Sequence, residues 1–133
     1  FREGAGPARE FDYVRALITE RDSTVWVAEE ADALVGCVVI IIRESPDVPI
    51  LVPIRYAMVD TLVVASAYRG AGVGHALMER AEAWAGRRGV HRIELNVFEF
   101  NIAAKRFYQR LGYSTLSRRM VKDLGLDQTR EGQ

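Results

Sequence analysis

The chain has 133 residues, a length that suits one compact domain built around one hydrophobic core. Its 18 basic and 18 acidic residues give no net charge, so no overall field draws it to nucleic acid or to an anionic membrane surface. A single cysteine excludes an internal disulfide, and no apolar run is long enough to cross a bilayer, so we expect a cytoplasmic protein without nucleic-acid or membrane partners.

A helix is predicted near the amino terminus, after a glycine- and proline-containing stretch over residues 1–9 that indicates a loop. The predicted helix covers residues 10–21, because its apolar side chains recur at helical spacing. These side chains are Phe11, Val14, Leu17 and Ile18.

Three strands are predicted to follow the helix. Runs rich in β-branched and aromatic residues cover residues 24–29, 34–43 and 54–64. A turn near residues 31–33 makes the first two strands a hairpin. Three prolines within residues 45–53 predict an irregular loop before the third strand.

The second half of the chain predicts helices alternating with strands. Apolar residues spaced by three or four positions predict a helix over residues 73–87, and its buried stripe contains Val73, Leu77, Ala81 and Trp84. Strict alternation predicts a strand over residues 91–98. The remaining predicted elements are a helix over 102–111 capped by Asn101 and ended by Gly112, a strand over 113–124, and a tail over 125–133.

This order of elements predicts one α/β domain over residues 1–133 with a mixed sheet. The strand over 54–64, the helix over 73–87 and the strand over 91–98 form a βαβ unit. Because such crossovers join parallel strands, we expect these two strands to be parallel neighbours.

The stretch "RGAGVG", residues 69–74, places three alternate glycines directly before a helix. A tight turn explains one glycine but not three. A dinucleotide-binding loop requires its third glycine where His75 stands, and a phosphate-binding P-loop requires a following Gly-Lys-Ser/Thr that is absent. Unhindered main-chain N–H groups at a helix start form an anion site that suits a pyrophosphate, which is the reading we favour.

Here the sequence resembles a family. "LVVASAYRGAGVGHALMERAEAWA" is similar to the acetyl-CoA signature of the GNAT N-acetyltransferase superfamily, with Arg69, Gly72 and Gly74 at its fixed positions. "ELNVFEFNIAAKRFYQRLGY" resembles the family's later motif, whose recurring residues stand here as Asn101, Ala104, Tyr108 and Gly112. The resemblance spans about residues 24–122.

The resemblance implies a GNAT-like fold: a mixed, mostly antiparallel twisted sheet with helices on both faces. The family usually begins with a strand and a helix before the helix expected at residues 10–21, and this chain lacks that first strand. Residue 1 is Phe rather than Met, which leads us to expect a chain that begins inside the domain.

The resemblance also implies acetyl-CoA as cosubstrate. Main-chain groups of Leu62, Val63 and Val64 would hold its pantetheine arm and polarise the acetyl carbonyl. The cofactor-binding residues of the glycine loop are then Arg69, Gly70, Ala71, Gly72, Val73 and Gly74. Asn101 and Ala104 join them from the later helix, where the small Ala104 leaves room for the cofactor. His75 and His91 lack the spacing of metal ligands, so no metal is expected.

Tyr108 is the candidate general acid. It lies four residues after Ala104 on one helical stripe, and the resemblance directs it toward the thioester sulfur. A phenol with a pKa of about 10 is only mildly mismatched as a proton donor to a thiolate of about 8.5. On helix position alone, a half-buried core tyrosine is the better interpretation.

Asp60 is the candidate base: the resemblance implies that it lies near where many relatives carry a carboxylate that deprotonates the amine, often through water. An acidic residue within an apolar strand also needs a partner or a cleft, which supports this role. Glu94 is its rival, and Asp60 could instead attract a cationic substrate.

These residues lead to an expected N-acetyltransferase. The amine would attack the thioester directly through a tetrahedral intermediate, and the acceptor would be a small-molecule primary amine. The alternatives are a non-catalytic acyl-CoA sensor and a dinucleotide-binding domain. A homodimer is expected only by analogy with the family.

Overall fold

The computed structural model describes residues 14–45 and 54–125, which belong to two compact units. Unit 1 ends at Phe98 and contains a five-stranded sheet with the helix α1 (Val73–Arg87). Unit 2 begins at Glu99 and contains the helix α2 (Ile102–Arg110). The loop expected at residues 1–9, most of the loop expected at 45–53 and the tail beyond residue 125 lie outside the described residues.

The sheet of unit 1 is mixed, with the strands in their sequence order. They are β1 (Val14–Thr19), β2 (Ser23–Glu30), β3 (Ala33–Glu44), β4 (Arg55–Val64) and β5 (Ile93–Leu95). The first four strands pair with one another in antiparallel fashion, whereas β5 is parallel to β4. The expected mixed, mostly antiparallel sheet and the expected crossover from β4 to β5 are both confirmed.

The hairpin of β2 and β3 is also confirmed, and a two-residue turn joins its strands, with Glu30 paired with Ala33. Ala31 has a φ of 53° and Asp32 a φ of 67°. Two successive residues with positive φ are typical of a two-residue turn whose twist matches the flanking strands.

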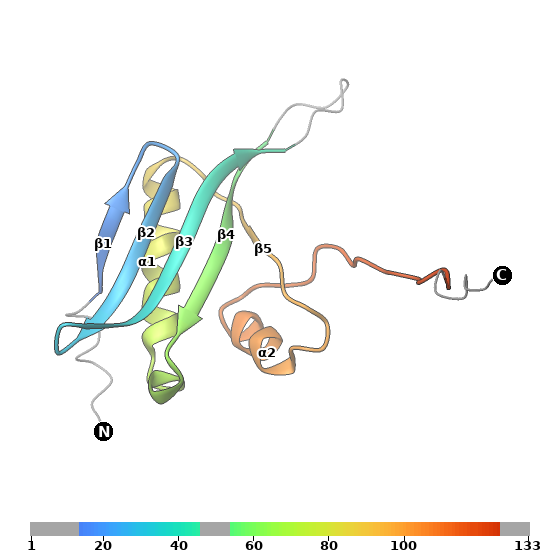
Figure 1. Ribbon diagram of the computed structural model, residues 1–133. Helices are drawn as coiled ribbons and strands as arrows, with labels where there is room; N and C mark the ends of the chain where they lie inside the picture. Colours follow the sequence, from blue (N-terminus) through green and yellow to red (C-terminus); the bar gives the residue numbers. More distant parts are fainter. Residues whose placement is uncertain (1–13, 46–53, 126–133) are drawn as a thin grey trace. The chain divides into compact units, whose positions relative to one another are not determined.

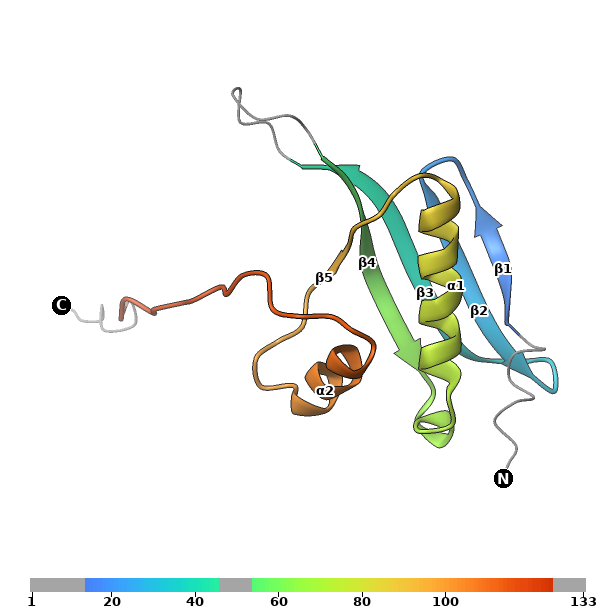
Figure 2. The ribbon, with the colours of Figure 1, turned by 180° about the vertical axis from the view of Figure 1, so that it is seen from behind.

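Helix α1 covers one face of the sheet, as Figure 1 shows from the open side and Figure 2 from behind. Its predicted stripe is confirmed: Val73, Leu77, Ala81 and Trp84 expose no more than 2% of their surface. Val38 and Ile40 of β3 and Ala57 of β4 are fully buried. Alternation along the strands places these side chains on the face that α1 covers, so the core of unit 1 lies between helix and sheet.

The prediction of a helix over residues 10–21 is wrong for its described part, because residues 14–19 form β1. Val14, Leu17 and Ile18 fit a helical stripe, but a run of six described residues is too short for its apolar spacing to distinguish a helix from a strand. Pairing with β2 makes these residues a strand. The Arg15 side chain forms two hydrogen bonds with Glu29 across the strands, at 2.8 and 3.1 Å, and Thr24 Oγ1 donates to the Ile18 carbonyl.

Two predicted strands are shortened or absent. The strand expected over residues 91–98 is reduced to Ile93–Leu95, because β4 offers β5 only the three partners Ala57, Met58 and Val59. The strand expected over residues 113–124 has no strand conformation. A strand needs a neighbouring ladder, and none of the described strands pairs with this segment. The sequence pattern of both segments gave no sign that a partner is missing.

Candidate functional site

The fourth strand changes its pairing at Asp60. Across the ladder Val39 faces Thr61 and Ile40 faces Val59, so Asp60 is an extra residue in β4 and forms a β-bulge. The parallel ladder with β5 stops at Val59, directly before the bulge. From Thr61 onward, β4 is paired with β3 on one side and with no described strand on the other.

The open edge of β4 presents main-chain groups of two predicted residues. Ala65 N–H donates to the Val35 carbonyl, which marks this pair as hydrogen-bonded. In an antiparallel ladder hydrogen-bonded and open positions alternate, so Val63 turns its main-chain groups toward β3. Leu62 and Val64 turn theirs toward the open edge. Of the three positions expected to hold a pantetheine arm, two therefore have the required orientation.

The glycine loop connects this edge to α1. A short 3-10 turn covers Ser66–Tyr68, and the chain then turns through Gly70, with a φ of 81°, and Gly72, with a φ of 91°. Side chains rarely tolerate such angles, so the turn itself requires these two glycines. Arg69 Nε donates to the Val64 carbonyl at 3.2 Å, which fastens the loop to the end of β4.

The start of α1 carries unused hydrogen-bond donors. Gly72 caps the helix without any side-chain hydrogen bond, and its first turn contains no acidic residue. The first bond into the helix joins Ala76 N–H to the Gly72 carbonyl at 3.0 Å. The N–H groups of Val73, Gly74 and His75 therefore have no acceptor within the helix, and the helix dipole adds positive potential there. Beyond its own chain neighbours, no atom lies within 4 Å of where a side chain of Gly70 would begin, so the space beside Gly70 is open.

The acidic candidates in unit 1 differ in their surroundings. Asp60 is exposed at the bulge and has no hydrogen-bond or ion-pair partner within residues 14–45 and 54–125. Glu94 of β5 accepts a hydrogen bond from Arg92 Nε at 2.9 Å. Of the two carboxylates, Asp60 is the one available to a substrate.

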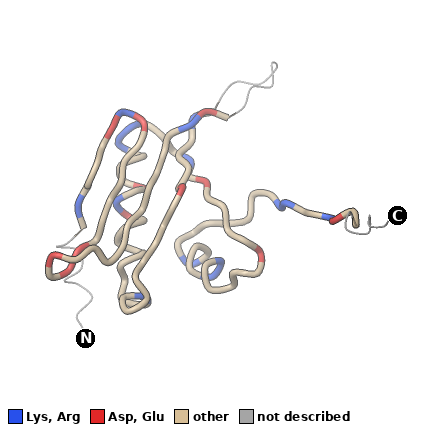
Figure 3. Tube along the Cα trace, viewed as in Figure 1, with Lys and Arg blue, Asp and Glu red and all other residues tan. Residues whose placement is uncertain are grey.

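Unit 2 contains the other predicted residues. The Asn101 side chain accepts a hydrogen bond from Ala104 N–H at 3.1 Å, which confirms it as the cap of α2. Gly112 follows the helix with a φ of 99°, as expected. The charged residues of α2 are all basic, and Figure 3 shows them on the helix. One of these, Lys105, is bound to the Glu99 carboxylate at 3.2 Å.

Tyr108 is half-buried within unit 2. Its ring packs edge-on against those of Phe107 and Tyr113, with centroids 5.1 and 5.8 Å away. Burial raises the pKa of the Tyr108 phenol, because the charged phenolate loses hydration there. The phenol therefore stays protonated throughout the physiological range and can act as a proton donor.

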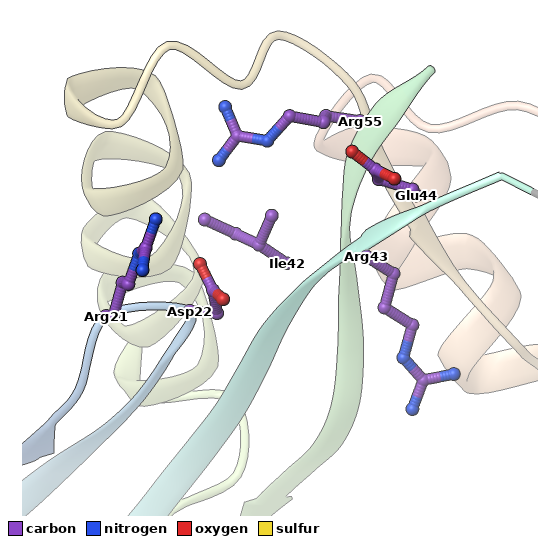
Figure 4. Close-up of a pocket in the computed structure, with 6 residues that line it drawn as sticks. All are labelled: Arg21, Asp22, Ile42, Arg43, Glu44 and Arg55. Atoms are coloured by element: carbon purple, nitrogen blue, oxygen red, sulfur yellow. The ribbon is translucent and has the colours of Figure 1, made fainter. Parts of the chain in front are cut away.

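A separate pocket lies at the opposite end of the sheet, where β3 ends and β4 begins. Figure 4 shows Arg21, Asp22, Ile42 and Arg55 around one space, while Arg43 points away. None of the predicted site residues lines this pocket. It is therefore distinct from the open edge of β4, which begins after the bulge at Asp60.

Within the described ranges, no three side chains of His, Cys, Asp or Glu gather as metal ligands. Neither described helix has the length and apolar character needed to cross a bilayer.

The mixed sheet with its bulge in β4 and the glycine-rich start of α1 agree with the family that the two sequence motifs indicate. The model of the acetyltransferase (GNAT) family matches residues 1–113. The chain therefore belongs to the GNAT family of acetyltransferases, as the two sequence motifs predict.

Several known proteins are similar to the chain in structure or in sequence. The tetramutant of the BH1408 protein from Bacillus halodurans is 30% identical, with a TM-score of 0.73 over 80% of this chain and 69% of that one. The aminoglycoside N-acetyltransferase AAC(6')-Iy in complex with CoA is 16% identical, with a TM-score of 0.68 over 78% of this chain and 77% of that one. The uncharacterized N-acetyltransferase YobR of Bacillus subtilis (strain 168) is 34% identical over 62 residues, which are 47% of this chain and 25% of YobR.

The structure thus divides the predicted residues into two groups. The open edge at Leu62 and Val64, the bulge at Asp60 and the glycine loop adjoin one another along the chain of unit 1. Asn101, Ala104 and Tyr108 form the second group on α2. Sequence reasoning missed the bulge and also missed Gly36, although an isolated glycine inside the strand "LVGCVV" is a known sign of close backbone approach.

Proposed function

We propose that the chain transfers an acetyl group from acetyl-CoA to the primary amine of a small molecule, as a cytoplasmic enzyme. One observation carries this proposal: the edge of β4 that no described strand pairs continues directly into a glycine loop and a helix start without a side-chain cap. These two features fit the two chemically different parts of CoA, an amide-containing arm and a charged diphosphate.

The diphosphate would lie against the N–H groups of Val73, Gly74 and His75, where positive potential and open backbone meet. Gly70, Ala71 and Gly72 would let it approach the main chain. Arg69 keeps its terminal guanidinium nitrogens for the phosphate, since only its Nε bonds the Val64 carbonyl.

The pantetheine arm would extend the sheet along Leu62 and Val64 as an additional strand. A main-chain N–H of this edge would donate to the acetyl carbonyl and stabilise the negative charge that develops on its oxygen. Val63 would not hydrogen-bond the pantetheine arm, because its main-chain groups pair with β3.

The reaction requires an uncharged amine and a proton for the departing thiolate. Asp60, with its free carboxylate, would accept the proton of the amine directly or through water. The amine nitrogen forms a bond with the carbonyl carbon, the carbon–sulfur bond breaks, and Tyr108 would give its proton to the sulfur. Asn101 would act by capping α2, and Ala104 by leaving space for the cofactor.

The acceptor class is supported by relatives of the same fold. AAC(6')-Iy has been solved with the bisubstrate analogue CoA-S-monomethyl-acetylneamine. An amine-bearing small molecule is therefore the acceptor that we test first. A panel of such amines, incubated with the chain and acetyl-CoA and monitored by thiol release, should give turnover with at least one amine. Saturable CoA binding without turnover across the panel would favour a non-catalytic sensor instead.

The base is tested by Asp60→Asn. We expect kcat/KM for the amine to fall about 100-fold, as is typical when a general base is lost, while the Kd for CoA stays unchanged. Glu94→Gln is the matched control and should retain activity, because Glu94 is already bound to Arg92. A raised KM for the amine at unchanged kcat would instead assign Asp60 to substrate attraction, and wild-type kinetics would remove it from the site.

A further inference from the structure

Gly36 of β3 lies where the sheet, the start of α1 and the end of β4 meet. It pairs with Val64 across the ladder. A methyl group on Gly36 would lie 2.9 Å from Val73 Cγ1, 3.1 Å from Leu77 Cδ1 and 3.1 Å from the Val63 carbonyl oxygen. These distances are shorter than ordinary carbon contacts, so any side chain at this position forces its neighbours to move.

The neighbours of Gly36 have little room to move. Val73 exposes 1% of its surface and Leu77 none, so both are enclosed by the core of unit 1. Protein cores are close-packed and transmit displacement rather than absorb it. The third neighbour, the Val63 carbonyl, belongs to the ladder between β3 and β4. A side chain would therefore displace α1 at its first turn, β4 at its last residues, or both.

These two segments carry the two halves of the proposed cofactor site. Val73 is the first residue of α1, whose free N–H groups would hold the diphosphate. Val63 lies between Leu62 and Val64, whose outward main-chain groups would hold the pantetheine arm. The separation of the two halves is fixed by how closely α1 approaches the sheet, and the absence of a side chain at Gly36 sets that approach.

We propose that Gly36 is a positioning residue for the CoA site, where its missing side chain keeps the start of α1 and the end of β4 at the spacing that CoA requires. This inference rests on the proposed function. It adds a residue that would not touch CoA and that neither motif contains.

The test is the affinity of Gly36→Ala for CoA, measured by calorimetry on the folded protein. We expect Kd to rise at least tenfold, and the KM for acetyl-CoA to rise with a smaller change in kcat. Two controls separate positioning from general stability. Ile40→Val, in the same strand and fully buried, should lower Tm without changing Kd. Gly86→Ala, which meets nothing within 4 Å, should change neither Kd nor turnover.

A rescue variant tests the contact itself. Val73→Ala removes the carbon closest to the new methyl group, so Gly36→Ala combined with Val73→Ala should bind CoA within about threefold of Val73→Ala alone. If Gly36→Ala does not fold, Val73→Ile pushes toward Gly36 from the helix side and should weaken CoA binding severalfold.

The outcomes separate this inference from the proposed function. If folded Gly36→Ala binds CoA with wild-type affinity, the inference is overturned and the proposed function still stands. If Gly36→Ala does not fold, wild-type affinity in Val73→Ile has the same meaning. A double variant that binds no better than Gly36→Ala also overturns it, because the steric contact would not be the cause. A wild-type chain that shows no saturable CoA binding contradicts the proposed function, and the inference fails with it.

Discussion

Tyr108→Phe is expected to lower kcat about 100-fold and to leave the Kd for CoA within about twofold of the wild-type value. The substitution removes only the hydroxyl, so the edge-on ring contacts with Phe107 and Tyr113 remain. A lost general acid typically costs two to four orders of magnitude. Steady-state kinetics with the best amine of the panel, together with a CoA titration, separates the two quantities.

The pH profile gives an independent check on this role. The donor must be protonated, and burial raises the pKa of the Tyr108 phenol above its usual value. Loss of activity through this group should therefore begin at a higher pH than for an exposed tyrosine, and the Phe variant should lack that decline. Tyr113→Phe is the matched control, since it removes a neighbouring hydroxyl and should leave kcat nearly unchanged. Equal rates for wild type and Tyr108→Phe would leave Tyr108 as a packing residue only.

Gly72→Val is expected to weaken CoA binding by tenfold or more, a loss of about 1.4 kcal/mol or greater. Its side chain would stand at the cap of α1, where the diphosphate must approach the free N–H groups of Val73 and Gly74. The variant also strains the backbone, because Gly72 has a φ of 91°. Calorimetric titration with CoA measures the affinity of the folded protein.

Gly89→Val separates obstruction from strain. Gly89 follows α1 at its other end with a φ of 75°, and nothing lies within 4 Å of its side-chain position. The free energy of unfolding of Gly89→Val should fall by about 1–2 kcal/mol, as for Gly72→Val, while its CoA affinity stays unchanged. If both variants bind CoA as the wild type does, the diphosphate does not lie at the start of α1.

Elements with a dense local pattern could be predicted from the sequence. The stripe of Val73, Leu77, Ala81 and Trp84 is long enough to define both the type and the buried face of α1. Asn101 and Gly112 bracket α2 because capping is a short-range interaction that the local sequence contains. The same holds for the hairpin of β2 and β3, whose alternation is long and whose turn is short.

Elements that depend on a distant partner could not be predicted as well. Val14, Ala16 and Ile18 form a strand because β2 accepts them, and no local signal distinguishes this from a helix. The segment over residues 113–124 has strand-forming residues but no ladder among the described strands. The bulge at Asp60 depends on the register between β3 and β4, which composition does not encode.

In the candidate site, too, local features could be predicted and features that depend on a distant partner could not. The loop could be predicted from Gly70 and Gly72, because backbone positions with positive φ favour glycine. Which of Leu62, Val63 and Val64 faces the open edge follows only from the hydrogen-bonded pair of Ala65 and Val35. Asp60 and Glu94 differ in availability because Arg92 lies beside Glu94 and because Asp60 is exposed at the bulge.

The position of CoA is tested most directly by the backbone amide signals of the isotope-labelled chain. Pantetheine alone should shift the amides of Leu62 and Val64, and CoA should shift these together with those of Gly72, Val73 and Gly74. Shifts confined to the pocket of Arg21 and Arg55, or an unchanged spectrum at saturating CoA, would contradict the account.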